Sequence, residues 1–128
     1  MPSKNPAQRL RDILDNIEAI NGFTAGMTFG DFLSDRKTIY AVTRALEIIS
    51  EASRRLPDEL KARHSHIDWP AVAAAGNVYR HEYEAVEESL VWHTIQNDLN
   101  GLRDLAQIEL ARIEPENAEP PNPARHLK

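Results

Sequence analysis

Apolar residues recur three and four positions apart along most of this chain, with charged residues between them. They form three stripes: Leu10, Ile13, Leu14, Ile17 and Ile20; Ile39, Val42, Ala45, Leu46, Ile49 and Leu56; and Val91, Ile95, Leu99, Leu102, Leu105, Ala106, Leu110 and Ile113. This spacing places each stripe on one face of a helix that buries it. Alternating Val, Ile and Thr runs are scarce, which disfavours a β-rich fold. The sequence therefore predicts an all-α fold, most simply an antiparallel helical bundle with additional short helices.

Turn, capping and proline residues predict where these helices begin and end. Asn21-Gly22 ends the first helix, and Pro57 ends the second because proline donates no N–H and clashes with the preceding turn. Asp68-Trp69-Pro70 begins another, with Asp68 as its cap. The expected elements cover residues 6–20, a capped turn at 28–33, 35–56, 57–63, 69–82 and 84–113. Gly76 then falls inside a helix, where it costs roughly 1 kcal/mol relative to Ala and calls for an explanation.

The composition changes near the C-terminal end. From Glu114 onward four prolines stand among Glu and Asn, a composition that cannot sustain a helix. The whole chain has 128 residues, which suits one domain. We therefore expect one helical domain over residues 1–113 and a flexible, Pro-rich tail over residues 114–128.

Charge and cysteine content exclude several classes of protein. Lys and Arg number 15 against 20 Asp and Glu, a net charge of −5, which disfavours a generally basic nucleic-acid binder. The absence of Cys excludes disulfides, thiolate zinc sites and a cysteine nucleophile, and it favours a cytoplasmic location. No apolar run approaches the roughly 18 residues that cross a bilayer, and the start lacks a signal-peptide core, so no membrane association is expected. Phosphate-loop, Ser-His-Asp and His-Glu-x-x-His patterns are also missing.

The side chains best suited to catalysis stand close together in the sequence. They are Asn77, Arg80, His81 and Tyr83. Helical spacing puts Asn77 and His81 on one face, where the histidine could act as a general base with an arginine neutralising a phosphate. The alternative is that His81 is satisfied at a helix end among tyrosines. From the residues alone, this structural interpretation is the more common one.

Two further groups admit both structural and functional interpretations. His64 and His66 could bind a metal, but a third ligand at suitable spacing is missing, so no metal site is predicted. Arg44, Glu47 and Glu51 form a polar ridge on the second long helix. They either form solvated charge pairs or line a groove, a dimer seam or a partner surface.

In their order and spacing, four segments resemble the HepT-like proteins, a branch of the HEPN ribonuclease superfamily. These segments are Arg44-Ala-Leu-Glu-Ile-Ile-Ser-Glu-Ala, Asp68-Trp69-Pro70, Asn77…His81-x-Tyr83 and Val86…Val91-Trp92…Ile95. The resemblance extends from about Leu10 to about Leu105. It implies an all-α bundle of HEPN type that forms a homodimer.

The resemblance also implies an activity and a partner. An Arg-x4-His motif from each subunit of such a dimer meets in a composite cleft and cuts RNA without a metal or another cofactor. The histidine helps to activate the ribose 2′-hydroxyl, and the arginine stabilises phosphate charge. These proteins are toxins of toxin–antitoxin systems, and the antitoxin is a minimal nucleotidyltransferase that attaches AMP to a tyrosine. The matching positions here are His81 and Asn77 for catalysis and Tyr83 for AMP attachment.

One position departs from the family pattern. Gly76 stands where the family has the arginine before the asparagine, and Arg80 points about 100° away around the helix, so it substitutes imperfectly. Four glutamates at 82, 84, 87 and 88 account for the net −4 of residues 1–113 and would repel phosphates near the motif. We therefore expect a weakened endoribonuclease toxin. The alternatives are a catalytically degenerate subunit that binds a nucleotidyltransferase, and a dimeric helical protein with neither partner nor activity.

Overall fold

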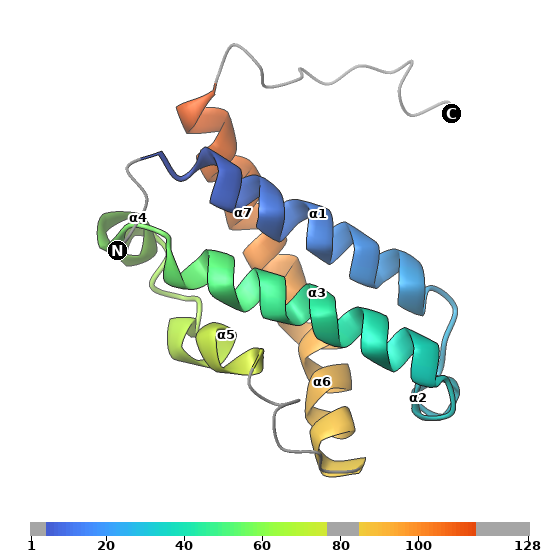
Figure 1. Cartoon of the computed structure of the whole chain (residues 1–128). Coiled ribbons are helices and arrows are strands. Elements are labelled where there is room, and N and C mark those ends of the chain that lie inside the picture. The colour runs from blue at the N-terminus through green and yellow to red at the C-terminus, as the bar shows by residue number, and fades with distance from the viewer. Residues whose placement is uncertain (1–4, 77–84, 115–128) are drawn as a thin grey trace, which may run out of the picture.

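The computed structural model describes residues 5–76 and 85–114, and every regular element in those ranges is helical (Figure 1). The helices are α1 (Ala7–Thr24), α2 (Phe29–Leu33), α3 (Arg36–Arg54), α4 (Asp58–Arg63), α5 (Trp69–Ala75), α6 (Ala85–Asn97) and α7 (Leu99–Ile113). The prediction of an all-α fold is confirmed. The expected tail begins at Glu114, and from residue 115 onward it lies outside the described residues.

Helix α1 extends past the point where Asn21-Gly22 was expected to end it. The hydroxyl of Thr24, the last residue of α1, donates to the carbonyl oxygen of Ile20 at 2.8 Å. The chain turns two residues later at Gly26, whose φ of 76° lies in the left-handed region that favours glycine. The predicted end was wrong because Gly22 is tolerated in the helix, while Gly26 provides the turn.

Local capping signals place the beginnings of α2, α3 and α5 where they were expected. The hydroxyl of Thr28 accepts from the N–H of Asp31, whose carboxylate accepts from the N–H of Thr28, which completes a capping box. Asp35 caps α3 by accepting a hydrogen bond from the N–H of Thr38. These caps confirm the short turn and the start of the long helix, and α3 ends at Arg54, before Pro57.

The C-terminal helical segment is divided where the sequence suggested one long helix. Asp98 separates α6 from α7, with φ of −105° and ψ of −30°. At the residue just before Asp98, the side-chain amide of Asn97 donates to the carbonyl oxygen of His93, one turn earlier, at 3.0 Å. Such local side-chain bonds compete with the helical ladder, which accounts for a division that the apolar spacing does not reveal.

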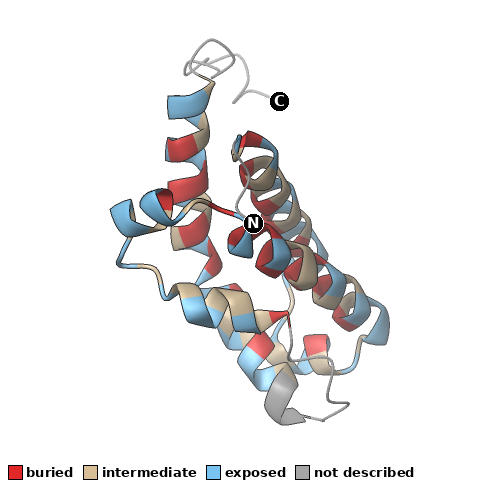
Figure 2. Cartoon of the chain, turned by 60° about the vertical axis from the view of Figure 1, so that its left-hand side comes forward, coloured by how far each residue is buried: buried red, intermediate tan, exposed pale blue. Residues whose placement is uncertain are grey.

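The apolar stripes meet in one core. Helix α1 packs against α3 and α7, and α1 and α3 run in opposite directions (Figure 1). The buried residues line the faces that the helices turn toward one another (Figure 2). Trp92 of α6 stacks against Phe32 of α2, with ring centroids 5.2 Å apart, which joins α6 to the body of the protein. Among the described helices, none combines the length and hydrophobicity needed to cross a membrane.

Candidate functional site

The predicted catalytic residues Asn77, Arg80 and His81, and the predicted AMP acceptor Tyr83, lie outside the described residues. The structure describes the helices on either side of this segment, α5 ending at Ala75 and α6 beginning at Ala85. The segment leaves α5 directly after Gly76. The contacts that hold α5 therefore determine where the candidate site begins.

The first turn of α5 is held by its cap and by a tryptophan. Asp68 accepts a hydrogen bond from the N–H of Ala71 at 3.1 Å, as the sequence predicted. The indole N–H of Trp69 donates to the carbonyl oxygens of Lys61 and His64, both at 3.2 Å. These bonds satisfy the polar groups around the α4–α5 connection and anchor the start of α5 against it.

The last turn of α5 is held by a serine of α3. Ser50 is 1% exposed, and its hydroxyl donates to the carbonyl oxygen of Val72 at 2.8 Å. The same hydroxyl accepts from the N–H of Gly76, also at 2.8 Å. One side chain of α3 therefore contacts both ends of the final turn of α5, immediately before the candidate site.

Gly76 is the residue that ends α5, and the expectation of a mid-helix glycine was wrong. A Cβ atom at this position would lie 2.9 Å from Ser50 Oγ, 3.0 Å from Ser50 Cβ and 3.1 Å from Glu47 Cα. The last of these atoms belongs to the backbone of α3 and cannot turn away as a side chain can. Glycine at 76 is thus explained by the close approach of α5 to α3.

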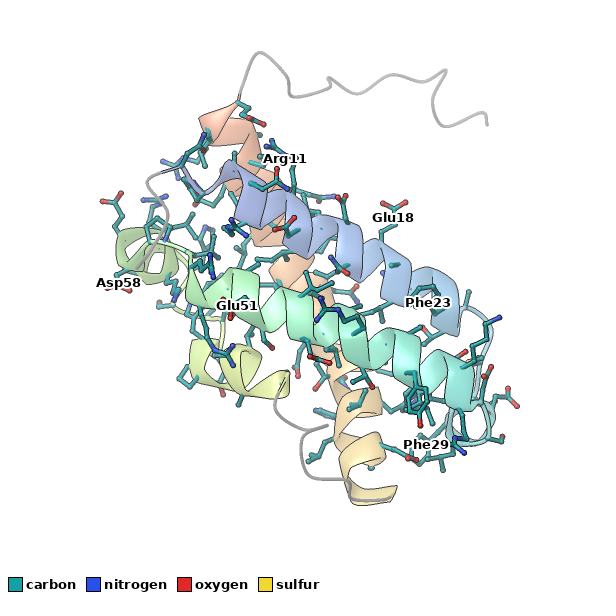
Figure 3. All side chains as sticks on the ribbon, viewed as in Figure 1. Arg11, Glu18, Phe23, Phe29, Glu51 and Asp58 are labelled. Atoms are coloured by element: carbon teal, nitrogen blue, oxygen red, sulfur yellow. The ribbon has the colours of Figure 1, made fainter. Side chains whose placement is uncertain are left out.

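The polar ridge of Arg44, Glu47 and Glu51 lies along α3, which α5 contacts (Figure 3 labels Glu51). Arg44, whose side chain is 71% exposed, approaches Glu47 at 3.7 Å. Glu51 pairs with Arg55 at 2.9 Å and with Arg54 at 3.3 Å, and the hydrogen bond from Arg55 lowers the pKa of the Glu51 carboxyl. These pairs fit the structural interpretation of the ridge, and its role as a dimer or partner surface stays a prediction.

Arg54 is a contact of the site that sequence reasoning missed. One terminal nitrogen of its guanidinium donates to the carbonyl oxygen of Ala73 in α5, and the other donates to the carboxylate of Glu51. A cation at the carbonyl end of a helix is favoured by the helix dipole. Its position three residues after Glu51 identifies the pair within α3, but nothing in the sequence places Ala73 beside it.

A cavity of about 370 Å³ opens between α3, α5 and the α6–α7 junction. Its apolar lining includes Leu46 and Ile49 of α3 and Val72 of α5, and Asp68 and Asp98 contribute carboxylates. Ala75 also lines it, which places the cavity next to the point where the candidate site begins. The sequence could not reveal the cavity because its walls come from three separate segments.

The interaction of His64 with a buried carboxylate explains the position of this histidine in the fold. The side chain of Glu109 in α7 is 1% exposed and lies 2.7 Å from a guanidinium nitrogen of Arg63 and 2.6 Å from Nε2 of His64. The hydrogen bond from Arg63 holds the pKa of the Glu109 carboxyl below its ordinary value, against the effect of burial. Among the described residues, no three His, Asp or Glu side chains cluster so that they could hold a metal ion. His64 instead joins the end of α4 to α7.

Comparison with known proteins supports the family resemblance that the order of motifs suggested. A family model described as ribonuclease HepT-like matches residues 13–108. A probable ribonuclease HepT of Thermococcus cleftensis is 42% identical over 94 residues, covering 73% of this chain and 86% of that protein. A putative RNase of Methanocaldococcus jannaschii is 34% identical over 109 residues, covering 84% of this chain and 90% of that protein. No solved structure matches the chain at a significant level.

Proposed function

The chain belongs to the ribonuclease HepT-like family, and we propose that it is an endoribonuclease whose catalytic side chains lie in residues 77–83. The observation that carries the proposal is the family match over residues 13–108, which spans the Asn77…His81-x-Tyr83 pattern. The relatives named as ribonucleases align over most of their own length. The proposed activity is therefore assigned to the whole aligned domain and not to a short shared segment.

The proposed reaction needs a base and a stabiliser of phosphate charge. His81, as neutral imidazole, takes the proton of a ribose 2′-hydroxyl, and the 2′-oxygen bonds to the adjacent phosphorus. The bond from phosphorus to the 5′-oxygen breaks, and the imidazolium returns its proton to that oxygen. Asn77 and Arg80 donate hydrogen bonds to the phosphate. The products are a 2′,3′-cyclic phosphate and a 5′-hydroxyl, and no metal is required.

Gly76 sets the expected level of this activity. The position at which the resemblance implies an arginine is a glycine here, and helical spacing alone would turn Arg80 about 100° away from His81. Removing one donor that stabilises transition-state charge typically costs about 10²–10³ in rate. We therefore expect slow cleavage compared with a relative that has the arginine.

Assembly and regulation follow the same proposal. Two copies form a homodimer with a composite cleft, and a minimal nucleotidyltransferase acts as the antitoxin of a toxin–antitoxin pair by transferring AMP to Tyr83. The exposed ridge of Arg44, Glu47 and Glu51 offers both signs of charge for a dimer or partner contact. All of these components would meet in the cytoplasm.

A second candidate function is a catalytically degenerate subunit that binds the nucleotidyltransferase. The observation in its favour is the space around Gly76, where any Cβ would meet Ser50 and the backbone of Glu47. The arginine therefore cannot return without a shift of α5 against α3. In this alternative the helical body and the partner surface remain while cleavage is lost.

The chemistry of the products tests the proposed activity. Purified protein is incubated in EDTA with an RNA oligonucleotide, and fragment ends are identified by mass spectrometry. We expect 2′,3′-cyclic phosphate and 5′-hydroxyl ends, and no cleavage of an oligonucleotide with 2′-deoxyribose at the cut position. Fragments that end in a 3′-hydroxyl, or cleavage of the deoxy substrate, would contradict attack by the 2′-oxygen. Co-elution with the nucleotidyltransferase and no cleavage would support the second candidate.

A further inference from the structure

We propose that the exposed face of α3 around Tyr40 binds single-stranded RNA, with a base stacked on the tyrosine ring and a phosphate bound by Arg44. The inference rests on the proposed function, since it names a surface that holds the substrate of that activity. The surface is formed by residues 36–44, all of which the structure describes, and it includes none of residues 77–84.

The first half of α3 is positively charged, although the chain as a whole is negative. Residues 36–44 contain three cations and no carboxylate, the cations being Arg36, Lys37 and Arg44. Asp35, immediately before them, is occupied by its cap bonds to Thr38, and the next carboxylate along the helix is Glu47. In a chain with a net charge of −5, this surface is therefore a local site of attraction for phosphates.

Tyr40 presents an aromatic ring to solvent at the centre of this surface. It is 63% exposed, more than any other large apolar or aromatic residue that the structure describes. The ring therefore contributes little to the core, and tyrosine is a weaker helix former than alanine or leucine. Bases of a single strand stack on such rings whatever their sequence, because every base has a π-face.

Arg36 holds the Tyr40 ring in place before any ligand binds. The guanidinium carbon of Arg36 lies over the ring, 5.6 Å from its centroid, and a guanidinium nitrogen donates to the phenol oxygen at 2.8 Å. These two contacts restrict an otherwise free side chain, so less conformational entropy is lost when a base stacks on it. Because Arg36 lies over one face of the ring, the other face is the one that receives the base.

Arg44 lies one turn beyond Tyr40 on the same face of α3, about 6 Å further along the helix axis. Its side chain is 71% exposed, and its one ion pair in the described part of the chain is with Glu47 at 3.7 Å, beyond hydrogen-bond distance. The guanidinium therefore keeps its donors for a ligand. Arginine binds phosphate through two parallel hydrogen bonds, which suits it to the backbone beside a stacked base.

The chemistry of this surface favours RNA over a protein partner. The core of a protein interface is depleted of charged residues, whereas the residues one turn before and after Tyr40 are both arginines. Of the other exposed large apolar residues that the structure describes, Phe23 belongs to α1 and the rest belong to α6 and α7. A single ring between cations is typical of proteins that stack the bases of a single strand.

The experiment measures binding of a fluorescein-labelled single-stranded RNA whose riboses all carry 2′-O-methyl groups, so that the 2′-oxygen cannot attack. Fluorescence anisotropy gives Kd for wild type, Tyr40→Ala and Tyr40→Phe. We expect Tyr40→Ala to raise Kd by about fivefold or more, and Tyr40→Phe, which keeps the ring, to stay within about twofold of wild type. In a duplex the base faces are covered by their neighbours, so Tyr40→Ala should leave the Kd for a duplex of the same RNA within about twofold.

Salt dependence separates the arginine from the tyrosine. Kd is measured between about 50 and 200 mM salt, and the slope of log Kd against log salt reports the number of phosphate contacts. Arg44→Ala should lower this slope by about 0.7, the value for one contact on a single strand, while Tyr40→Ala leaves it near wild type. Arg103→Ala is the matched control, because Arg103 of α7 also has a carboxylate, that of Asp104, at 3.7 Å. It should change neither Kd nor the slope.

The inference is overturned if wild type does not bind the single strand, or if Tyr40→Ala and Arg44→Ala bind it as well as wild type does. It is also overturned if Arg103→Ala matches Arg44→Ala, or if Tyr40→Ala weakens duplex binding equally. A change of oligomeric state in Tyr40→Ala with unchanged RNA binding would make the surface an interface between copies of the chain, and the inference would again fail.

The proposed function is tested separately, by the ends of the fragments cut from unmodified RNA. Binding that depends on Tyr40 and Arg44, without cleavage, would support this inference and contradict the proposed function. Cleavage by wild type, with equal RNA binding by all variants, would support the proposed function and overturn this inference.

Discussion

The backbone N–H of Gly76, at the end of α5, donates a hydrogen bond to the hydroxyl of Ser50 in the middle of α3, across 2.8 Å. This bond lies immediately before the segment that carries the predicted catalytic residues. It brings the two helices so close that position 76 has no space for a side chain. Gly76, which the family resemblance marks as a departure from the expected motif, is therefore also a packing contact of the fold.

Gly76→Ala tests that contact through stability. The added Cβ meets the backbone of Glu47 at 3.1 Å, so we expect a loss of about 1 to 3 kcal/mol in the free energy of unfolding, measured by urea denaturation. Gly101→Ala is the control, because it lies inside α7 with only an ordinary contact nearby. Alanine is the better helix former there and should add up to about 1 kcal/mol. Equal changes in the two variants would show that position 76 is not crowded.

Glu109→Gln tests the buried carboxylate that joins α7 to α4. The amide offers one acceptor oxygen in place of two beside Arg63 and His64, so the free energy of unfolding at pH 7 should fall by about 1 to 3 kcal/mol. Asp104→Asn, on the same helix but 65% exposed, should have little effect. A Glu109→Gln protein as stable as wild type would show that this network contributes nothing to stability.

The same carboxylate predicts how stability depends on pH. Arg63 lowers the pKa of Glu109 in the folded protein, so the unfolded chain binds more protons between the two pKa values, and stability rises with pH in that window. The contribution is fully present above the unfolded pKa of about 4.3 and is lost as the pH falls through the folded pKa. The free energy of unfolding, measured by urea denaturation between pH 3 and 7, should therefore change less with pH for Glu109→Gln than for wild type. Parallel curves would contradict this account.

Asp68→Ala tests the cap at the other end of α5. The substitution removes the acceptor for the Ala71 N–H and should lower the free energy of unfolding by about 1 kcal/mol. Asp68→Asn keeps an acceptor oxygen and should retain most of that stability. If the asparagine variant loses as much as the alanine variant, the carboxylate contributes through its charge rather than through capping.

Tyr83→Phe tests the proposed modification by the nucleotidyltransferase. After incubation with that enzyme and ATP, wild type should gain the mass of one AMP, and the phenylalanine variant should gain none. Tyr40→Phe is the control, because Tyr40 is 63% exposed on α3 and offers an accessible phenol elsewhere in the chain. AMP found on Tyr40, or on both tyrosines, would contradict the assignment to Tyr83.

Local signals in the sequence predicted much of the fold. The boundaries set by the Thr28 and Asp31 capping box, by Asp35 and by Asp68 agree with the structure, because each is decided by atoms within four residues. The resemblance in the order of motifs predicted the family that the comparisons confirmed. The residues of the candidate site follow from that resemblance alone.

Contacts between distant segments could not be predicted. The N–H of Gly76 binds a hydroxyl 26 residues earlier, and the partner of Arg63 lies 46 residues later at Glu109. No spacing rule connects such pairs, so the sequence left the glycine at position 76 unexplained and gave no partner for His64. Tertiary packing resolved both.

Cleavage of RNA in EDTA by wild type, His81→Ala and His93→Ala tests the central claim most directly. His93 is an exposed histidine on α6, so its loss controls for the removal of an imidazole outside the candidate site. The account predicts slow cleavage by wild type and by His93→Ala, and a rate at least about 100-fold lower for His81→Ala. Equal rates for all three proteins would contradict an enzyme that uses His81.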